Sequence, residues 1–286
     1  MGMKILKQAL LMVLALLLVA GPAVAQQDAP SGEDYVQQAE SGSINWDNGS
    51  MIATGVGAPP ANAVNAAQAR GMAKRAATVI ARRNLLELIK GVQIDSSTTV
   101  ENFMVSSDVV VSRIRGFLQN SQILDTAYMS DGSVEVTVGL KLRGGISDVV
   151  LPKADRFKLQ APAAAPKPEQ LVPGAYTGLV VDARGLGVRP AMSPRILDED
   201  GKELYGTVMV SREYAIQQGM AGYAKDQDKA MTNPRVGSNP MTVAAVAVKG
   251  RSRSDLVIPT AKAEEIRTQA ESKEYLGQAR VMILLD

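Results

Sequence analysis

The chain contains no histidine and no cysteine among its 286 residues. Histidine is the usual general base near neutral pH and the commonest metal ligand, and cysteine supplies thiolate nucleophiles, soft-metal ligands and disulfides. Their absence excludes Ser-His and Cys-His catalysis and nearly all zinc, copper, haem and iron–sulfur chemistry. The Ser-x-x-Lys and Gly-x-Ser-x-Gly motifs of other hydrolytic enzymes do not occur either. We therefore expect a non-enzymatic protein with no catalytic, cofactor-binding or metal-binding residues.

A strong net charge is also lacking, because 31 basic residues face 29 acidic ones. The N-terminus has the pattern of a secretory signal peptide: Lys4 and Lys7, an apolar run over 9–20, and small residues ending at Ala25. The alternative, an uncleaved anchor helix, would need a longer apolar run. Cleavage after Ala25 removes two lysines and no acid, so the net charge falls from +2 to zero. A neutral chain favours no nucleic-acid partner. Without a cysteine at the junction we expect no lipid anchor, and a periplasmic or secreted protein.

Composition divides the chain into five parts. A signal peptide (1–25) precedes a polar leader (26–43) that we expect to be flexible. A first α+β domain (44–151) and a second one (175–286) are separated by a linker (152–174). The linker carries five prolines around an alanine run, and proline favours an extended, semi-rigid chain. We expect this linker to hold the two domains apart.

The first domain is predicted as a β–α–α–β–β module with two helices on an antiparallel sheet. Strand segments over 44–56 are broken at Asp47-Asn48-Gly49. Helices are expected over about 62–90 and 102–120, joined by a short exposed extended segment. Apolar residues at three- and four-residue steps predict the buried stripe of the first helix: Ala69, Met72, Ala76, Val79, Leu86 and Ile89.

Two further strands complete the first domain. Apolar residues alternate with others from Val134 to Leu142, which predicts a strand with one buried face. A second strand over 123–129 should pair with it through a tight turn at Asp131-Gly132.

The second domain is expected to be a mixed α/β domain. Strands are predicted over 175–182, 241–248, 256–258 and 279–285, with a hairpin over 194–206. A helix is expected over 214–230, where Gly219 and Gly222 are unfavourable, and another over 260–269 with Thr260 as its N-cap.

Residues of the first helix resemble a known family. The stretch Gly55-x-Gly57, Ala67-x-Ala69-Arg70, Ala76-x(5)-Arg82-Arg83-Asn84-Leu85-Leu86-Glu87 and Lys90-Gly91-Val92 is similar to the Lpp-twenty-type envelope lipoproteins and to the N-terminal domain of flagellar assembly protein T. The resemblance covers 44–151. It implies a non-enzymatic α+β module of the bacterial envelope, whose relatives build rings around the flagellar basal body. The lipobox cysteine of the lipoproteins is missing here. Residues 176–186 and 193–196 also resemble segments of envelope proteins.

Several motifs have two interpretations. Gly55-Val-Gly57 and Gly185-Leu-Gly187 suggest phosphate loops but lack the rest of such fingerprints, so we interpret them as turn glycines at strand ends. The acids at 198–200 could bind calcium, but EF-hand spacing is absent and a hairpin turn is favoured. The spacing of Arg83 and Glu87 fits an exposed ion pair. The alternative is a buried ionic network or a protein interface formed by Arg82, Arg83 and Glu87. Trp46 is interpreted as a core anchor rather than a stacking platform.

Two functions from different classes remain open. The first is an exported structural protein of the bacterial envelope, an accessory of the flagellar basal body, whose sheet edges and helix faces contact further copies or envelope proteins. The alternative is a periplasmic protein that binds a small molecule in a cleft between its two domains.

Overall fold

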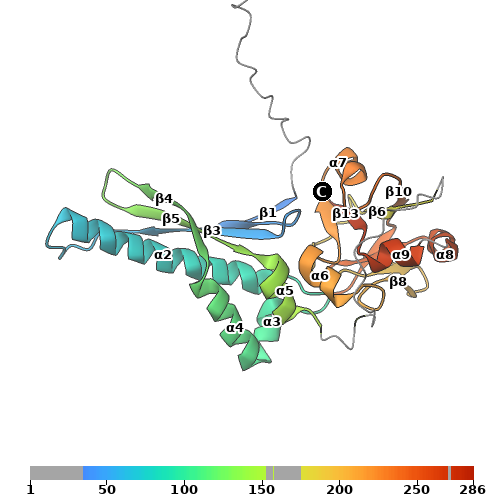
Figure 1. The fold of residues 1–286 in the computed structure, drawn as a ribbon, viewed down its shortest axis with the longest axis horizontal. Coiled ribbons are helices and arrows are strands. Elements are labelled where there is room, and N and C mark those ends of the chain that lie inside the picture. The colour runs from blue at the N-terminus through green and yellow to red at the C-terminus, as the bar shows by residue number, and fades with distance from the viewer. Residues whose placement is uncertain (1–34, 153–156, 158–174, 270–271) are drawn as a thin grey trace, which may run out of the picture. The chain divides into compact units, whose positions relative to one another are not determined.

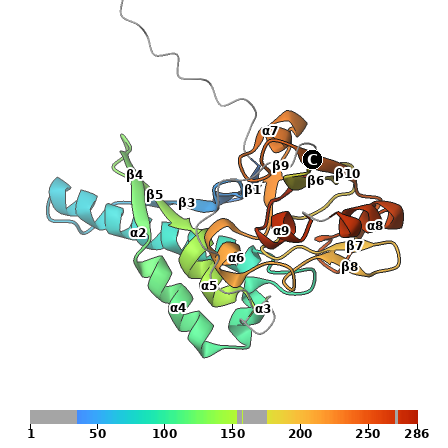
Figure 2. The same ribbon diagram turned by 45° about the vertical axis from the view of Figure 1, so that its right-hand side comes forward.

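The computed structural model describes residues 35–152, 157, 175–269 and 272–286. The predicted signal peptide and nearly all of the predicted linker lie outside these residues. The chain forms a mixed α+β structure with one antiparallel sheet in its first half and two smaller sheets in its second half (Figures 1 and 2). The α+β fold class expected from the sequence is confirmed.

The first sheet has five antiparallel strands in the order β1-β2-β3-β5-β4. Their bounds are β1 (Val36–Ala39), β2 (Gly42–Asn45), β3 (Ser50–Gly57), β4 (Gln122–Tyr128) and β5 (Val134–Lys141). The expected break at Asp47-Asn48-Gly49 separates β2 from β3, and the alternating run forms β5. The sheet begins before residue 44, because β1 and the start of β2 fall in the stretch expected to be leader.

One long helix, α2 (Ala66–Gly91), lies along one face of this sheet (Figure 1). Its N-cap is Asn65, whose side chain accepts a hydrogen bond from the Gln68 amide at 2.8 Å. The second expected helix is broken at Ser106-Ser107 into α3 (Val100–Val105) and α4 (Asp108–Gln119). Beyond β5 the chain makes an irregular turn, η1 (Leu142–Ile146), and a short helix, α5 (Ser147–Val150).

The buried face of α2 differs from the predicted stripe. Its buried residues follow four-residue steps: Ala73, Ala77, Ala81 and Leu85, followed by Leu88 and Ile89. Met72 and Val79, which the sequence pattern placed inside, are 41% and 67% exposed. The reason is β3. A Cβ on Gly55 would lie 2.2 Å from the Ala81 nitrogen, so the helix approaches this strand so closely that only alanines fit between.

The second half contains two four-stranded sheets. The parallel sheet has the order β10-β6-β13-β9, and the mixed sheet has the order β11-β12-β7-β8. Their bounds are β6 (Gly178–Asp182), β7 (Ile196–Asp198), β8 (Glu203–Tyr205), β9 (Gly222–Ala224), β10 (Pro240–Ala244), β11 (Ala247–Lys249), β12 (Asp255–Ile258) and β13 (Val281–Leu284).

In the described part of the second half, four helices accompany these strands: α6 (Arg212–Gln218), α7 (Gln227–Thr232), α8 (Thr260–Thr268) and α9 (Ser272–Gly277). The single helix expected over 214–230 is wrong, because Gly219, with φ of +77°, ends α6, and β9 follows. The helix over 260–269 is confirmed as α8. Its N-cap is Pro259 rather than Thr260. The Thr260 amide donates a hydrogen bond to the Glu199 carboxylate at 2.9 Å.

Candidate interaction surface

Strand β4 is an edge of the first sheet and is exposed along most of its length (Figure 1). Among the described residues it pairs only with β5. The strand and the residue after it carry four exposed apolar side chains: Ile123 (46%), Leu124 (54%), Tyr128 (55%) and Met129 (43%). An exposed edge with large apolar side chains is a template for pairing with another strand.

The backbone of β4 offers unused hydrogen-bonding groups on its outer side. The Met129 amide donates to the Ser133 carbonyl at 2.9 Å, so the Met129 backbone faces β5. Alternate residues of an antiparallel strand direct their N–H and C=O groups to opposite sides. The backbone groups of Thr126 and Tyr128 therefore point away from β5, where a further strand would meet them.

Natural edges are usually protected by lysines, prolines or bulges. Here the only charged residue of β4 is Asp125, and one bulge lies between Ile123 and Asp125. The side chain of Leu124 lies over Gly139 of β5, where a Cβ would come within 2.6 Å of it. The half of the edge from Thr126 onward carries none of these protections.

Trp46 lies at a second notable place, where the two halves of the chain meet. Trp46 is 5% exposed, and its ring contacts Tyr223 of β9 edge-on with 5.5 Å between ring centroids. The indole nitrogen donates to the Gln37 side chain at 3.0 Å. The interpretation of Trp46 as a core anchor is confirmed, and the core that it anchors contains residues of both halves.

Backbone hydrogen bonds reinforce this contact between the halves. The Met192 and Ser193 amides donate to the carbonyls of Gln93 and Ile94 at 2.9 and 2.8 Å. The guanidinium of Arg212 donates to Asp148, with 2.8 Å between Nη1 and Oδ1. The expectation that the linker holds the halves apart is therefore wrong, since residues on either side of it share one buried cluster.

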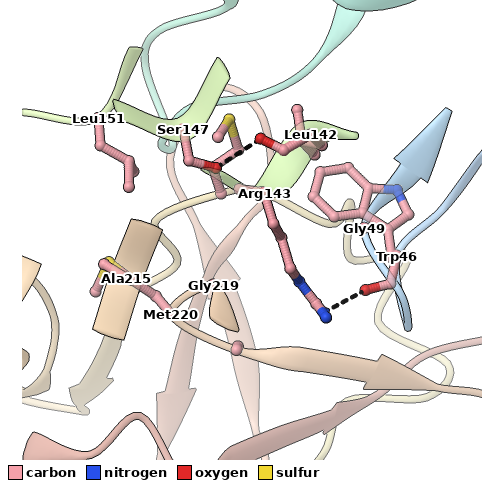
Figure 3. A pocket seen from close by; sticks show the side chains of 12 residues that line it. Trp46, Gly49, Leu142, Arg143, Ser147, Leu151, Ala215, Gly219 and Met220 are labelled. Atoms are coloured by element: carbon pink, nitrogen blue, oxygen red, sulfur yellow. Dashed lines mark hydrogen bonds between the residues drawn. The ribbon is translucent and has the colours of Figure 1, made fainter. Parts of the chain in front are cut away.

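A small pocket lies at this contact and is lined by Trp46, Arg143, Met220 and neighbouring residues (Figure 3). Arg143 donates from Nη2 to the carbonyls of Trp46 and Asp47 at 3.1 and 2.7 Å. Burial lowers the pKa of Arg143, and the charge of Asp47 partly opposes this. The cavity volume is about 30 Å³, whereas small-molecule sites usually measure about 300–1,000 Å³. The pocket has room for a few water molecules at most.

A second half-buried arginine, Arg235, lies near Arg143. Its Nη1 donates to the Ala279 and Gly219 carbonyls at 2.8 and 3.2 Å. Burial and the neighbouring Arg143 charge lower its pKa to about 10, so it stays charged at neutral pH. Both guanidinium groups bind backbone carbonyls of loops, which is a structural role.

The motifs singled out in the sequence have the following places. The acids at 198–200 form the turn between β7 and β8. The Asp198 carboxylate accepts the Lys202 amide at 2.8 Å and contacts Arg267 at 2.9 Å, as the hairpin interpretation predicts. The interpretation of Gly185 and Gly187 as turn glycines is confirmed by their φ values of +75° and +60°.

Two other motifs differ from expectation. Gly55 lies inside β3 and Gly57 is its last residue, and both permit the close approach of α2 rather than forming a turn. The Arg83–Glu87 pair does not form, because Glu87 binds Lys90 at 2.9 Å. Arg82 instead donates to the Ser121 hydroxyl at 3.2 Å.

Within the described ranges, no three or more acidic side chains come close enough to hold a metal ion. None of the helices in those ranges combines the length and apolar character that crossing a membrane requires.

Comparison with known protein families finds a similarity in the second half of the chain. Residues 178–286 match the family model described as Treponema pallidum Tp0624, second domain. This similarity covers the two sheets of the second half, whereas the β4 edge lies outside it. No curated protein matches the chain.

Proposed function

We propose that this chain is an exported, non-enzymatic structural protein of the bacterial cell envelope that assembles through strand β4 with a second copy of itself. The observation that carries the proposal is the exposed β4 edge, with its apolar side chains and outward backbone groups. Edge-to-edge pairing would satisfy these groups and join two five-stranded sheets into one.

The sequence of β4 suits antiparallel pairing with itself. Placing a two-fold axis at Thr126 sets the outward backbone groups of the two Thr126 residues opposite each other. Each Asp125 then lies opposite Ala127 of the other copy, so the two carboxylates do not face each other. Threonine pairs across strands are favourable, whereas like charges directly opposite are destabilising.

Export and the site of assembly rest on sequence. The signal-peptide pattern ending at Ala25 supports a periplasmic or secreted protein. The similarity of 44–151 to Lpp-twenty-type proteins and to flagellar assembly protein T supports an accessory role at the flagellar basal body, with envelope or basal-body proteins as further partners. The match of 178–286 to a domain named for a bacterium, Treponema pallidum, supports a bacterial setting. The lack of histidine and cysteine supports a role without catalysis, cofactor or metal.

The alternative function, binding of a small molecule between the domains, gains no support from the contact between the halves. The cavity there is about 30 Å³, and the arginine that lines it, Arg143, already donates to the backbone carbonyls of Trp46 and Asp47. We therefore favour assembly.

Sedimentation velocity of the exported, processed protein tests the assembly step. Thr126→Pro removes an outward N–H and leaves the groups that face β5, whereas Thr126→Val keeps the N–H and the branched side chain. We expect the wild type and Thr126→Val to sediment as dimers and Thr126→Pro as a monomer with an unchanged circular dichroism spectrum. A monomeric wild type at tens of micromolar would contradict the proposal.

A clean deletion strain tests the flagellar role. We expect lost swimming in soft agar with filaments still present, restored by the gene in trans. Unchanged swimming would contradict the role at the flagellar basal body. The proposal of an envelope protein that assembles through β4 would then stand without it.

A further inference from the structure

Helix α2 carries a second apolar stripe, on the side away from the sheet. Met72, Ala76 and Val79 are exposed at three- and four-residue steps, and Ile80 beside them is 39% exposed. The opposite side of the helix is already buried through Ala73, Ala77 and Ala81. The sheet covers one apolar side of the helix, and the second side is open to a partner.

The same helix is strongly basic. Six of its residues are lysine or arginine, and its single acid, Glu87, is bound to Lys90. The other five basic residues (Arg70, Lys74, Arg75, Arg82 and Arg83) make no ion pair with any residue of the described ranges. Arg75 and Arg83 are exposed and flank Val79 along the stripe.

We propose that this face of α2 binds the surface of an anionic lipid bilayer. Basic side chains attract anionic headgroups, and apolar side chains between them enter the boundary with the acyl chains. A second copy of the chain is a poor occupant, because two such faces carry the same charge. Single-stranded nucleic acid is also a poor occupant, since α2 has no aromatic residue on which bases could stack.

This inference does not depend on pairing through β4, which lies at the edge of the sheet. It adds the membrane surface to the partners of the protein. Binding of this kind is reversible and sensitive to salt, because most of it is electrostatic.

Flotation of the exported, processed protein with lipid vesicles tests the proposal. The vesicles contain phosphatidylglycerol and phosphatidylethanolamine, or phosphatidylcholine alone. We expect flotation with the anionic vesicles at low salt, loss of it at 0.5 M salt, and none with phosphatidylcholine. Failure of the wild type to float with anionic vesicles at low salt would overturn the proposal, and so would equal flotation with both lipids.

Matched variants locate the binding face. Arg75→Gln with Arg83→Gln should lower the partition coefficient about 25-fold, at about fivefold for each charge. Arg115→Gln with Lys141→Gln removes the same charge from exposed positions outside α2 and should have little effect. Equal losses in the two double variants would show a response to net charge alone and overturn the assignment to α2. A third outcome is that the wild type binds an acidic envelope protein but no vesicles, and that Arg75→Gln with Arg83→Gln abolishes this binding. That outcome would overturn the lipid proposal in favour of a protein partner.

Val79→Ser tests the apolar part of the face. It should weaken vesicle binding while leaving the thermal midpoint within a few degrees, because Val79 is 67% exposed. Unchanged binding in this variant would overturn the role of the apolar stripe.

Discussion

The ring of Tyr223 meets the ring of Trp46 edge-on, with 5.5 Å between centroids and 72° between planes. Trp46 follows β2 of the first sheet, whereas Tyr223 belongs to β9 of the parallel sheet. The Tyr223 hydroxyl also donates to the Ala191 carbonyl at 2.7 Å and accepts from the Ala191 amide at 2.9 Å. Each half therefore supplies an aromatic ring to a core that both share.

This shared core predicts that the halves unfold together. Tyr223→Phe removes both hydrogen bonds to Ala191 and should cost about 1–3 kcal/mol of the free energy of unfolding. Trp46 is the only tryptophan, so its fluorescence reports the first half. We expect its urea midpoint to fall in Tyr223→Phe and to coincide with the transition followed by circular dichroism. A fluorescence midpoint unchanged by this substitution would contradict a shared core, and Tyr214→Phe, at a half-buried position, serves as the control.

Two glycines should respond oppositely to alanine. A Cβ at Gly55 would lie 2.2 Å from the Ala81 nitrogen and 2.6 Å from the Ala77 oxygen, and backbone atoms cannot move aside cheaply. Gly55→Ala should cost about 1–3 kcal/mol. Gly71 is exposed within α2 with nothing within 4 Å of a Cβ, so Gly71→Ala should stabilise by about 0.8–1 kcal/mol. Urea denaturation of both variants measures these changes, and equal effects would contradict the close approach of α2 to β3.

Asp198 should make stability fall in acid. Burial raises its pKa, but hydrogen bonds from the Lys202 amide and Arg267 outweigh this and hold the pKa below the ordinary value of 3.8. The unfolded chain then binds a proton at a higher pH than the folded one. The stabilisation by Asp198 is complete above about pH 3.8. It is lost as the pH falls through the lower pKa that Asp198 has in the folded chain. Asp198→Asn should be less stable at pH 7 and show a shallower loss below pH 4, measured by urea denaturation at each pH. An unchanged profile would exclude this carboxylate as a source of acid sensitivity.

Glu203 should make stability fall as the pH rises, the opposite of the effect of Asp198. Burial raises its pKa above 4.5, the Arg195 charge opposes the shift, and Asp255 adds to it. The folded chain then holds its proton at a higher pH than the unfolded one, so stability falls as pH rises from about 4.5 through the folded value. Glu203→Gln should be more stable than wild type at pH 7 and similar at pH 4. The exposed Glu101→Gln is the control, and a Glu203→Gln variant less stable at pH 7 would contradict the assignment.

Local patterns predicted much of the fold. The alternation from Val134 to Leu142 predicted β5, and the turn residues Asp198 to Gly201 predicted the hairpin of β7 and β8. These signals are local, because they depend on side-chain periodicity and on backbone angles that few residues adopt.

The surfaces proposed here could not be predicted from sequence. Three- and four-residue periodicity in α2 predicts one buried stripe, which includes Met72 and Val79. The alanine stripe is buried instead because Gly55 and Gly57 lie beneath it in space, and helical spacing alone does not show which neighbour is a glycine. The shared core of Trp46 and Tyr223 was missed for the same reason, since these residues lie far apart in the sequence.

A disulfide across the proposed two-fold axis tests the central claim most directly. The chain has no cysteine, so Thr126→Cys introduces the only thiol. Facing residues in such a pair lie about 5.5 Å apart between Cα atoms, within the range that a disulfide spans. We expect mild oxidation of the exported protein to give a covalent dimer for Thr126→Cys and none for Val208→Cys, at a position 58% exposed in the second half. A monomeric Thr126→Cys protein, or equal dimer from both variants, would contradict assembly through β4.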